Sequence, residues 1–212
     1  MNAYIILAEG GTGELVEKKS RFIATLRPVE SEAEAVCFIE EMKKKYWDAR
    51  HNCSAFVIGQ KGELTRCSDD GEPSGTAGKP MLEVLLGAEV RNVAVVVTRY
   101  FGGTLLGTGG LVRAYSQAVK EGLEHSLLKR MCPGMRVVAE TDYNGIGKIQ
   151  YLLAQNNLEP EHTEYTEKVV MSILLPLEQK DRLIKDMTEA TNGKIKITES
   201  GMSYYSEVLS YE

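Results

Sequence analysis

The sequence predicts an α+β protein of two domains. Short runs of β-branched and apolar residues alternate with stretches of helical periodicity along the 212 residues. The pattern breaks around RMCPG (130–134), and the residues beyond it follow an order of elements of their own. We therefore expect one domain over residues 1–130 and a second over residues 131–212.

The first expected elements are two strands and a helix. Residues 13–17 and 20–28 are rich in β-branched and apolar residues, which is typical of strands. Ser31 and Glu34 form a capping-box pattern, and apolar residues then recur at helical spacing as far as Tyr46. A helix should therefore follow the second strand.

The rest of the first domain should contain three strands and two helices. Residues 53–59 and 62–68 have strand character and are joined by a glycine turn. A short helix is expected through 80–87, with proline near its start and glycine at its end. Residues 91–100 form a nearly continuous β-branched run, which indicates a central strand buried on both faces. An apolar stripe over 111–127 predicts a long amphipathic helix.

The second domain has a recognisable order of elements. The expected sequence is strand, helix, a hairpin, helix and a final pair of strand segments, at 135–143, 146–156, 158–165 with 167–176, 178–190, and 194–200 with 203–209. This βαββαβ order with helices on one face is the ferredoxin-like plan.

Charge limits the nucleic-acid partners that the chain can bind. The net charge is −5, with 17 basic and 17 acidic residues in 1–130 and 8 against 13 in 131–212. The chain as a whole is therefore no polycation. Binding to nucleic acid would need a local basic patch, because the electrostatic contribution depends on the phosphates that are neutralised.

Other patterns exclude a membrane span and a cysteine framework. The longest apolar runs are far shorter than a spanning helix, and the N-terminal residues lack the features of a secretory signal. The four cysteines show no C-x-x-C pairing or regular spacing, which argues against a zinc site and against disulfides. We expect a cytoplasmic protein with reduced thiols, no metal and no cofactor.

Residues 69–113, here called the glycine-rich segment, contain nine of the 20 glycines. Glycine is favoured at such density where the backbone needs φ above zero or approaches a ligand closely. Charged residues lie in the same segment. We expect an anion-binding or partner-binding site formed by Lys79, Arg99, Tyr100, Gly102, Gly103, Gly107, Gly109, Gly110 and Arg113.

Standard phosphate loops do not fit this segment. Gly102 and Gly107 have the spacing of a Walker A loop, but Thr108 stands where that loop needs lysine. In a Rossmann pattern Val112 would have to be glycine. What remains is a strand, a glycine-rich turn and a helix N-terminus at Gly110, whose free N–H groups attract anions.

The charged residues of the segment permit two interpretations each. Arg113 in a first helical turn opposes the helix dipole, so it either faces an anion or pairs with one of the nearby carboxylates. The acidic loop Asp69, Asp70 and Glu72 could hold a metal or act in acid–base chemistry, but such residues more often form Asx-turns and helix caps. Both questions stay open at this level.

His51 and Cys53 suggest a possible nucleophile. Residues i and i+2 of a strand lie on the same face, so a thiol–imidazole contact is possible. No orienting partner or signature accompanies the pair, and this weakens the hypothesis.

DDGEPSGTAGKP (69–80) followed by VVVTRYFGGTLLGTGGLVRAYSQA (95–118) resembles the IMPACT/YigZ family. The resemblance covers roughly residues 15–125, and the ferredoxin-like unit looks like the extra domain of bacterial members. It implies a first domain with the fold shared by a small-subunit ribosomal protein, a domain of elongation factor G and the GHMP kinases. It implies a second domain like another domain of elongation factor G.

The resemblance also implies a function. Eukaryotic members regulate translation by contacting the activator of an amino-acid-starvation kinase, without catalysis. Our first hypothesis is a non-enzymatic protein that binds the ribosome, RNA or a translation-associated protein through the glycine-rich segment, with Lys79, Arg99 and Arg113 on phosphates. The second is an enzyme or sensor for a small phosphorylated ligand in the same crevice. The third is an interaction module whose glycines only permit tight packing.

Overall fold

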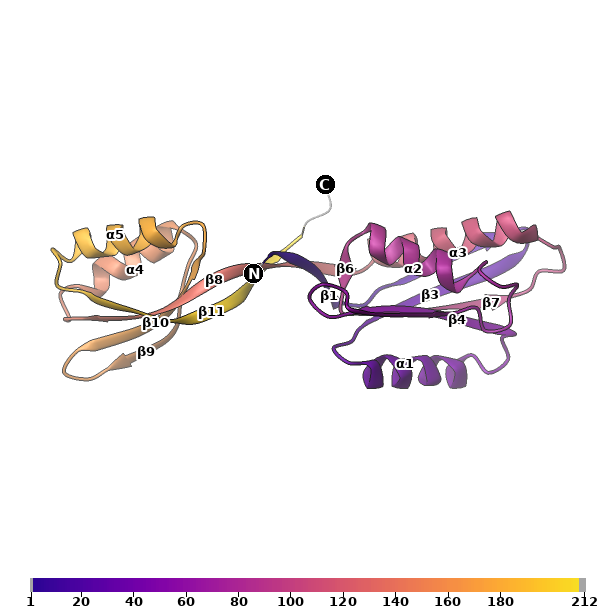
Figure 1. The fold of residues 1–212 in the computed structure, drawn as a ribbon, viewed down its shortest axis with the longest axis horizontal. Helices are drawn as coiled ribbons and strands as arrows, with labels where there is room; N and C mark the ends of the chain where they lie inside the picture. Colours follow the sequence, from indigo (N-terminus) through magenta and orange to yellow (C-terminus); the bar gives the residue numbers. More distant parts are fainter. Residues whose placement is uncertain (1, 210–212) are drawn as a thin grey trace. The chain divides into compact units, whose positions relative to one another are not determined.

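The computed structural model describes residues 2–209 and divides the chain into two compact units. The first unit is built on Tyr4–Arg130 and the second on Met131–Glu207. Each combines a mainly antiparallel sheet with helices (Figure 1). The α+β prediction is confirmed.

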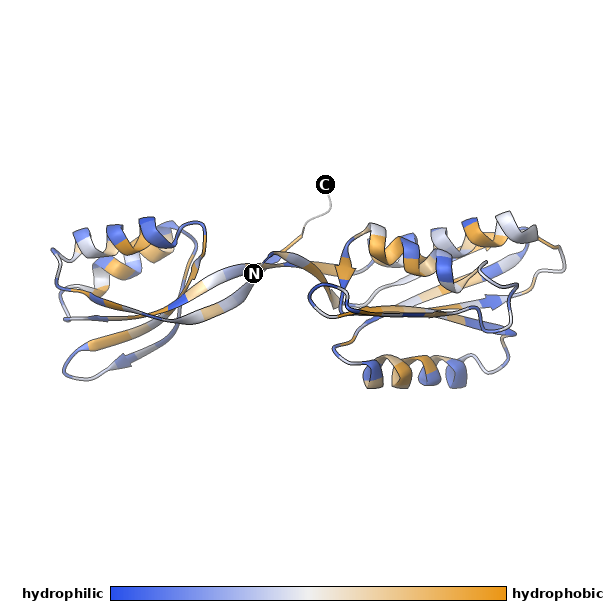
Figure 2. Cartoon of the chain, viewed as in Figure 1, coloured by the Kyte–Doolittle hydropathy of each residue, from blue (hydrophilic) through white to orange (hydrophobic). Residues whose placement is uncertain are grey.

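The first unit contains a five-stranded antiparallel sheet in the order β2-β3-β7-β4-β5. β7 lies in the middle, and its residues are buried from Val93 to Arg99. The prediction of a central strand is therefore confirmed, and Figure 2 shows the hydrophobic character of these central strands. The strands are β2 (Thr12–Glu17), β3 (Ser20–Pro28), β4 (His51–Ile58), β5 (Leu64–Ser68) and β7 (Val93–Tyr100).

Helices cover both faces of this sheet. α2 (Gly78–Gly87) and α3 (Gly107–Glu124) lie on one face, and α1 (Glu32–Lys45) lies on the other (Figure 1). The larger core cluster contains residues of α2 and α3, whereas the smaller one contains residues of α1. At the start of α1 the Ser31 hydroxyl accepts the Glu34 N–H at 3.3 Å, as the capping pattern predicts.

The first unit differs from the sequence-based expectation in two places. β1 (Tyr4–Glu9) and β6 (Val90–Arg91) form a parallel pair that was not predicted. β6 has only two residues, which are too few for a pattern. α3 begins at Gly107, not near residue 111. Glycine is a poor helix former, but burial of the apolar stripe downstream stabilises the whole helix. Three glycines that the sequence assigned to the loop before the helix therefore lie in the first helical turn of α3: Gly107, Gly109 and Gly110.

The second unit has the predicted βαββαβ order, and its sheet runs β9-β10-β8-β11. α4 and α5 contribute Ile149, Leu153, Leu183 and Met187 to a core shared with β8 and β10. The elements are β8 (Leu127–Thr141), α4 (Ile146–Gln155), β9 (Pro160–Tyr165), β10 (Val169–Pro176), α5 (Lys180–Ala190) and β11 (Lys196–Val208).

The strand predicted to begin at residue 135 begins instead at Leu127, so secondary structure is not interrupted at 130–134. β8 continues through these residues although they include proline. Pro133 has no N–H, but its carbonyl accepts the N–H of Leu177 at 3.1 Å, so the strand still gains a hydrogen bond there. β11 is likewise one strand and not two, and its Gly201 has a φ of +143°, which glycine adopts readily.

Candidate functional site

The acidic loop of the glycine-rich segment is organised by Asp69. Its carboxylate accepts three backbone N–H groups, from Gly75 at 2.8 Å, Ala77 at 3.0 Å and Gly78 at 2.8 Å. Burial alone would raise the pKa of Asp69, but these hydrogen bonds together lower it. Ala77 is the N-cap residue of α2, and its methyl side chain cannot accept a hydrogen bond. Asp69 therefore caps the helix in its place.

Glu72 accepts two hydrogen bonds in the protein interior. Its Oε1 lies 2.6 Å from Arg99 Nη1 and accepts the Tyr115 hydroxyl at 2.8 Å. Both charged side chains are almost fully buried, with 7% of Arg99 and 3% of Glu72 exposed. The aromatic rings of Phe22 and Phe101 lie 5.4 and 5.7 Å from the guanidinium carbon. Arg99 therefore tethers the acidic loop to the central strand.

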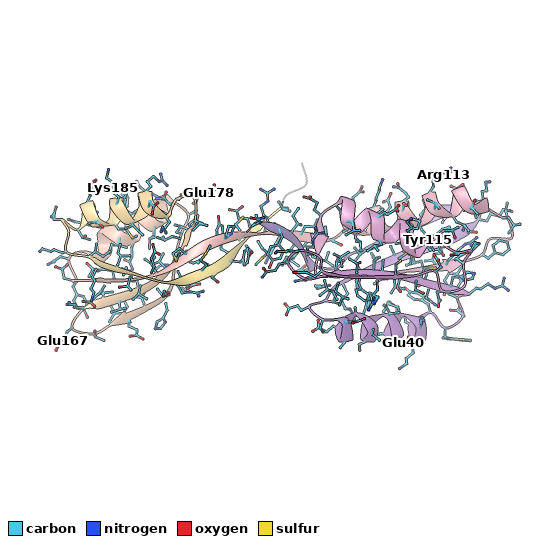
Figure 3. The ribbon with its side chains drawn as sticks, in the orientation of Figure 1. Glu40, Arg113, Tyr115, Glu167, Glu178 and Lys185 are labelled. Atoms are coloured by element: carbon cyan, nitrogen blue, oxygen red, sulfur yellow. The ribbon has the colours of Figure 1, made fainter. Side chains whose placement is uncertain are left out.

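Tyr115 connects this ion pair to α3. Figure 3 places the residue between α3 and the sheet, where it is completely buried. Burial raises the pKa of Tyr115, so its hydroxyl stays protonated and donates to Glu72. The sequence showed Tyr115 only as one member of an apolar stripe. The available signal was that a buried tyrosine hydroxyl needs a hydrogen-bond partner.

Asp70 is also held by neighbours. Its Oδ2 accepts the Asn52 N–H at 2.7 Å, its Oδ1 lies 3.4 Å from Lys43 Nζ, and its carbonyl lies 2.9 Å from His51 Nδ1. All three acidic side chains of the loop thus have protein partners. Over residues 2–209 no group of three or more potential metal ligands occurs.

His51 and Cys53 have separate partners in the acidic loop. The Cys53 thiol lies 2.9 Å from the Asp69 carbonyl and 3.3 Å from the Tyr115 hydroxyl. Burial raises the pKa of Cys53 to about 12. A thiol that stays protonated is a poor nucleophile, so the environment of Cys53 does not suit the catalytic hypothesis.

We predict that Cys53 resists a thiol reagent in the native protein. Cys37 is exposed and should be labelled rapidly at pH 8. Cys53 should become labelled only when urea unfolds the first unit, because the thiol must leave the core to react. Peptide mapping by mass spectrometry separates the sites. Labelling of both residues at comparable native rates would contradict the buried environment of Cys53.

The glycines of the 101–110 region have different requirements. The Gly102 N–H donates to Ser20 Oγ at 3.1 Å, and a Cβ on Gly102 would lie 2.0 Å from the Lys19 carbonyl carbon. Gly103 and Gly107 have φ values of +85° and +70°, which other residues adopt only with strain. Gly109 has neither constraint, since its nearest neighbour would be Arg113 Nη1 at 3.8 Å.

Alanine substitutions should separate these roles. Gly102→Ala should lower the free energy of unfolding by about 1–3 kcal/mol, because the new methyl group overlaps the backbone of Lys19. Gly109→Ala should change it by less than about 1 kcal/mol and in the stabilising direction, because alanine favours the helix. Urea denaturation of the two variants checks the contrast. A large destabilisation by Gly109→Ala would support the packing hypothesis for that glycine.

The remaining predicted binding residues, Lys79, Tyr100 and Arg113, lie on three different elements. Lys79 in the first turn of α2 lies 4.0 Å from Glu83, and the Tyr100 hydroxyl donates to Asp48 at 2.8 Å. Arg113 is on the outer side of α3 (Figure 3). It lies in the second turn of the helix, beyond the first turn where the dipole is strongest.

Arg113 lines a surface groove of about 440 Å³ together with Gly110, Lys120 and Glu17. Among the described residues it has no ion-pair partner, and the three carboxylates considered as partners are bound elsewhere. Within residues 2–209, no helix is long and apolar enough to cross a membrane.

Comparison with known proteins identifies relatives over nearly the whole chain. A family model described as the Impact N-terminal domain matches residues 18–123, and one described as domain of unknown function DUF1949 matches residues 140–194. The IMPACT family member YvyE of Bacillus subtilis is 41% identical, covering 100% of this chain and 97% of its own. The IMPACT family member YigZ of Escherichia coli is 35% identical, over 93% of this chain and 98% of its own. The crystal structure of a hypothetical protein aligns with a TM-score of 0.58 and 34% identity, over 93% of this chain and 97% of that one.

Proposed function

The chain belongs to the IMPACT family, and from this premise we propose that it is a cytoplasmic regulator of translation that acts by binding. In this proposal the first unit binds the ribosome, RNA or a translation-associated protein through the surface around the glycine-rich segment. Eukaryotic relatives, as the family resemblance implies, act through contact with a partner and not through catalysis.

The observation that carries the proposal is that the carboxylates of the acidic loop are bound by groups of the protein itself. Asp69, Asp70 and Glu72 are bound by backbone N–H groups, Lys43, Arg99 and Tyr115, so their carboxylates act as structural acceptors. The thiol of Cys53 is buried beneath them. A rigid loop with exposed neighbours suits recognition, whereas its chemistry does not suit acid–base or nucleophilic catalysis.

Cosedimentation of the purified chain with ribosomes and with total RNA at low salt tests the proposal. Phosphate-dominated binding should be strongest there and should weaken as salt rises. Arg113→Ala should weaken it uniformly across RNA sequences. Arg99→Ala should act differently, by destabilising the fold, because Arg99 is buried. No association with ribosomes, RNA or a translation protein from a matched lysate would overturn the proposal.

The groove beside α3 supports one alternative, a small phosphorylated ligand. Gly110, Arg113 and Lys120 line it and could contact a phosphate near the start of the helix. A thermal-shift screen of nucleotides and sugar phosphates, with and without magnesium, tests this alternative. A ligand at 100 times its Kd should stabilise the protein by about 2.7 kcal/mol, and the absence of any shift would exclude this function.

A further inference from the structure

We propose that the end of the first unit where β7 terminates binds single-stranded RNA, with exposed aromatic side chains stacking on bases and unpaired cations contacting phosphates. The proposal rests on the function proposed above and specifies its ligand. We call this region the strand-end surface. It consists of Lys18, Lys19, Trp47, Arg50, Phe101, Leu105 and Arg113.

Three connections bring these residues to one end of the sheet. The N–H of Gly102 donates to Ser20 Oγ at 3.1 Å, which holds the loop after β7 against the turn between β2 and β3. The Tyr100 hydroxyl donates to Asp48 at 2.8 Å, which holds the loop after α1 against the same strand end. Arg113 lines a groove together with Glu17, the last residue of β2.

The surface exposes three large apolar side chains, of which Phe101 also contacts the guanidinium of Arg99. Trp47 is 82% exposed, Leu105 is 82% exposed and Phe101 is 48% exposed. One exposed apolar residue needs no explanation, but three lie on two loops that the Tyr100–Asp48 hydrogen bond joins. We treat them as one apolar patch, of the kind that marks an interaction site. Trp47 and Phe101 offer flat aromatic faces, on which any base can stack.

Cations without ion-pair partners surround the patch. Within the described residues, Lys18, Lys19, Arg50 and Arg113 are exposed and take part in no ion pair, although the chain carries a net charge of −5. The last turn of α1 adds Lys44 at the same end. Several acidic residues lie at the same end, but Glu14, Asp70 and Glu72 are paired with Arg21, Lys43 and Arg99. Asp69 accepts backbone N–H groups. Glu17 and Asp48 form no ion pair, and Asp48 accepts the hydroxyl of Tyr100. The surplus of positive charge complements a polyanion.

The turn between β2 and β3 keeps its lysines at a conformational cost. Lys18 and Lys19 have φ values of +46° and +68° and form a two-residue turn. Such turns favour asparagine and glycine, because both central residues need positive φ. Two lysines in this strained geometry place two charges at the tip of the hairpin. Strain of this kind concentrates at functional sites.

The distribution of the charges favours a polymer over a single phosphate or a phosphopeptide. The cations come from three separate segments, around residues 18–19, 44–50 and 113, and most are not gathered in one pocket. A chain with a charge at every unit can follow such a path. A phosphopeptide is better recognised by a compact arginine cluster. The aromatic faces add contacts for bases that an acidic peptide lacks.

Trp47 allows a direct test in the unmodified full-length chain, because it is the only tryptophan. Titration with a 12-nucleotide oligouridine at low salt should quench its fluorescence as a base stacks on the indole. Trp47→Ala should weaken binding, measured by anisotropy of labelled RNA, by at least about fivefold, the low end for one stacked base. Trp47→Phe should recover most of the affinity, since a phenyl ring can still stack.

Charge variants test the second part of the surface. Lys18→Gln with Lys19→Gln should lower the slope of log affinity against log salt by about 1.4, or about 0.7 for each phosphate contact on a single strand. The matched control is Lys61→Gln with Lys185→Gln, which makes the same charge change at exposed positions elsewhere. Tyr151→Ala is the aromatic control, because Tyr151 is 64% exposed on α4. Both controls should leave affinity within twofold.

The outcomes distinguish this inference from the proposed function. Quenching of Trp47 with loss of affinity in the surface variants alone supports both. Ribosome association that survives Trp47→Ala and the lysine variants, without quenching by oligouridine, overturns the RNA surface and leaves the proposed function standing. Quenching by polyglutamate but not by oligouridine assigns the surface to an acidic protein and overturns RNA. Absence of RNA, ribosome and translation-protein binding overturns both.

Discussion

Replacing Glu72 by alanine should lower the free energy of unfolding of the first unit by about 3–5 kcal/mol, the usual cost of breaking a buried ion pair. The substitution leaves the guanidinium of Arg99 buried without its counter-charge and removes the acceptor of the Tyr115 hydroxyl. Arg99 already has one buried nitrogen, Nε, without a partner among the described residues. It therefore has no spare contact to compensate.

Labelling of the Cys53 thiol in urea measures this loss specifically, since Cys53 is in the core of the first unit. Glu14→Ala is the matched control. It breaks the ion pair between Glu14 and Arg21. The N···O distance of that pair is a similar 2.7 Å, but both side chains are about half exposed. Exposed pairs contribute at most about 1 kcal/mol. If the two variants lose equal stability, the Glu72–Arg99 pair is not acting as a buried pair.

The second large effect is expected at Asp69. Asp69→Ala should cost about 2–4 kcal/mol, because the N–H groups of Gly75, Ala77 and Gly78 lose their acceptor and α2 loses its cap. Asp69→Asn should cost less, since an amide oxygen still accepts hydrogen bonds without the charge. Urea denaturation of the three proteins at pH 7 measures the order.

The pH dependence of Asp69 follows from the lowered pKa of its carboxyl group in the folded protein. Its contribution to stability is complete above the unfolded pKa of about 3.9. The contribution is lost as pH falls through the lower folded pKa, because protonation then costs native hydrogen bonds. The stability difference between wild type and Asp69→Asn should therefore shrink below about pH 4. A difference that stays constant to lower pH would contradict this account.

Most secondary structure could be predicted because its signals are local. The buried run of β7, the capping box of α1 and the βαββαβ order of the second unit depend on residues close in sequence. The failures occurred where distant residues decide. The first turn of α3 consists largely of glycine, and its helical conformation depends on packing further along the helix. β8 crosses Pro133 because Leu177, which directly follows β10, donates its N–H to the Pro133 carbonyl.

The candidate site was predicted as a segment, and the structure separates its residues. Arg99, Lys79 and Arg113 seemed equivalent as cations in one stretch, but one is buried and two are exposed on different helices. The strand-end surface was missed for the opposite reason. Lys18, Trp47 and Leu105 are far apart in sequence, and no pattern links them until the strands pair.

The sequence by itself determined the fold class, the order of the elements in the second unit and the family resemblance of the glycine-rich segment, since periodicity and motif spacing depend on neighbours along the chain. Only the tertiary structure decided the role of each charge. Glu72 meets Arg99 across 27 residues and Tyr115 across 43. Burial of that network turns the acidic loop into a structural element, and the unpaired cations and exposed aromatics at the end of β7 are what the fold leaves available for a partner.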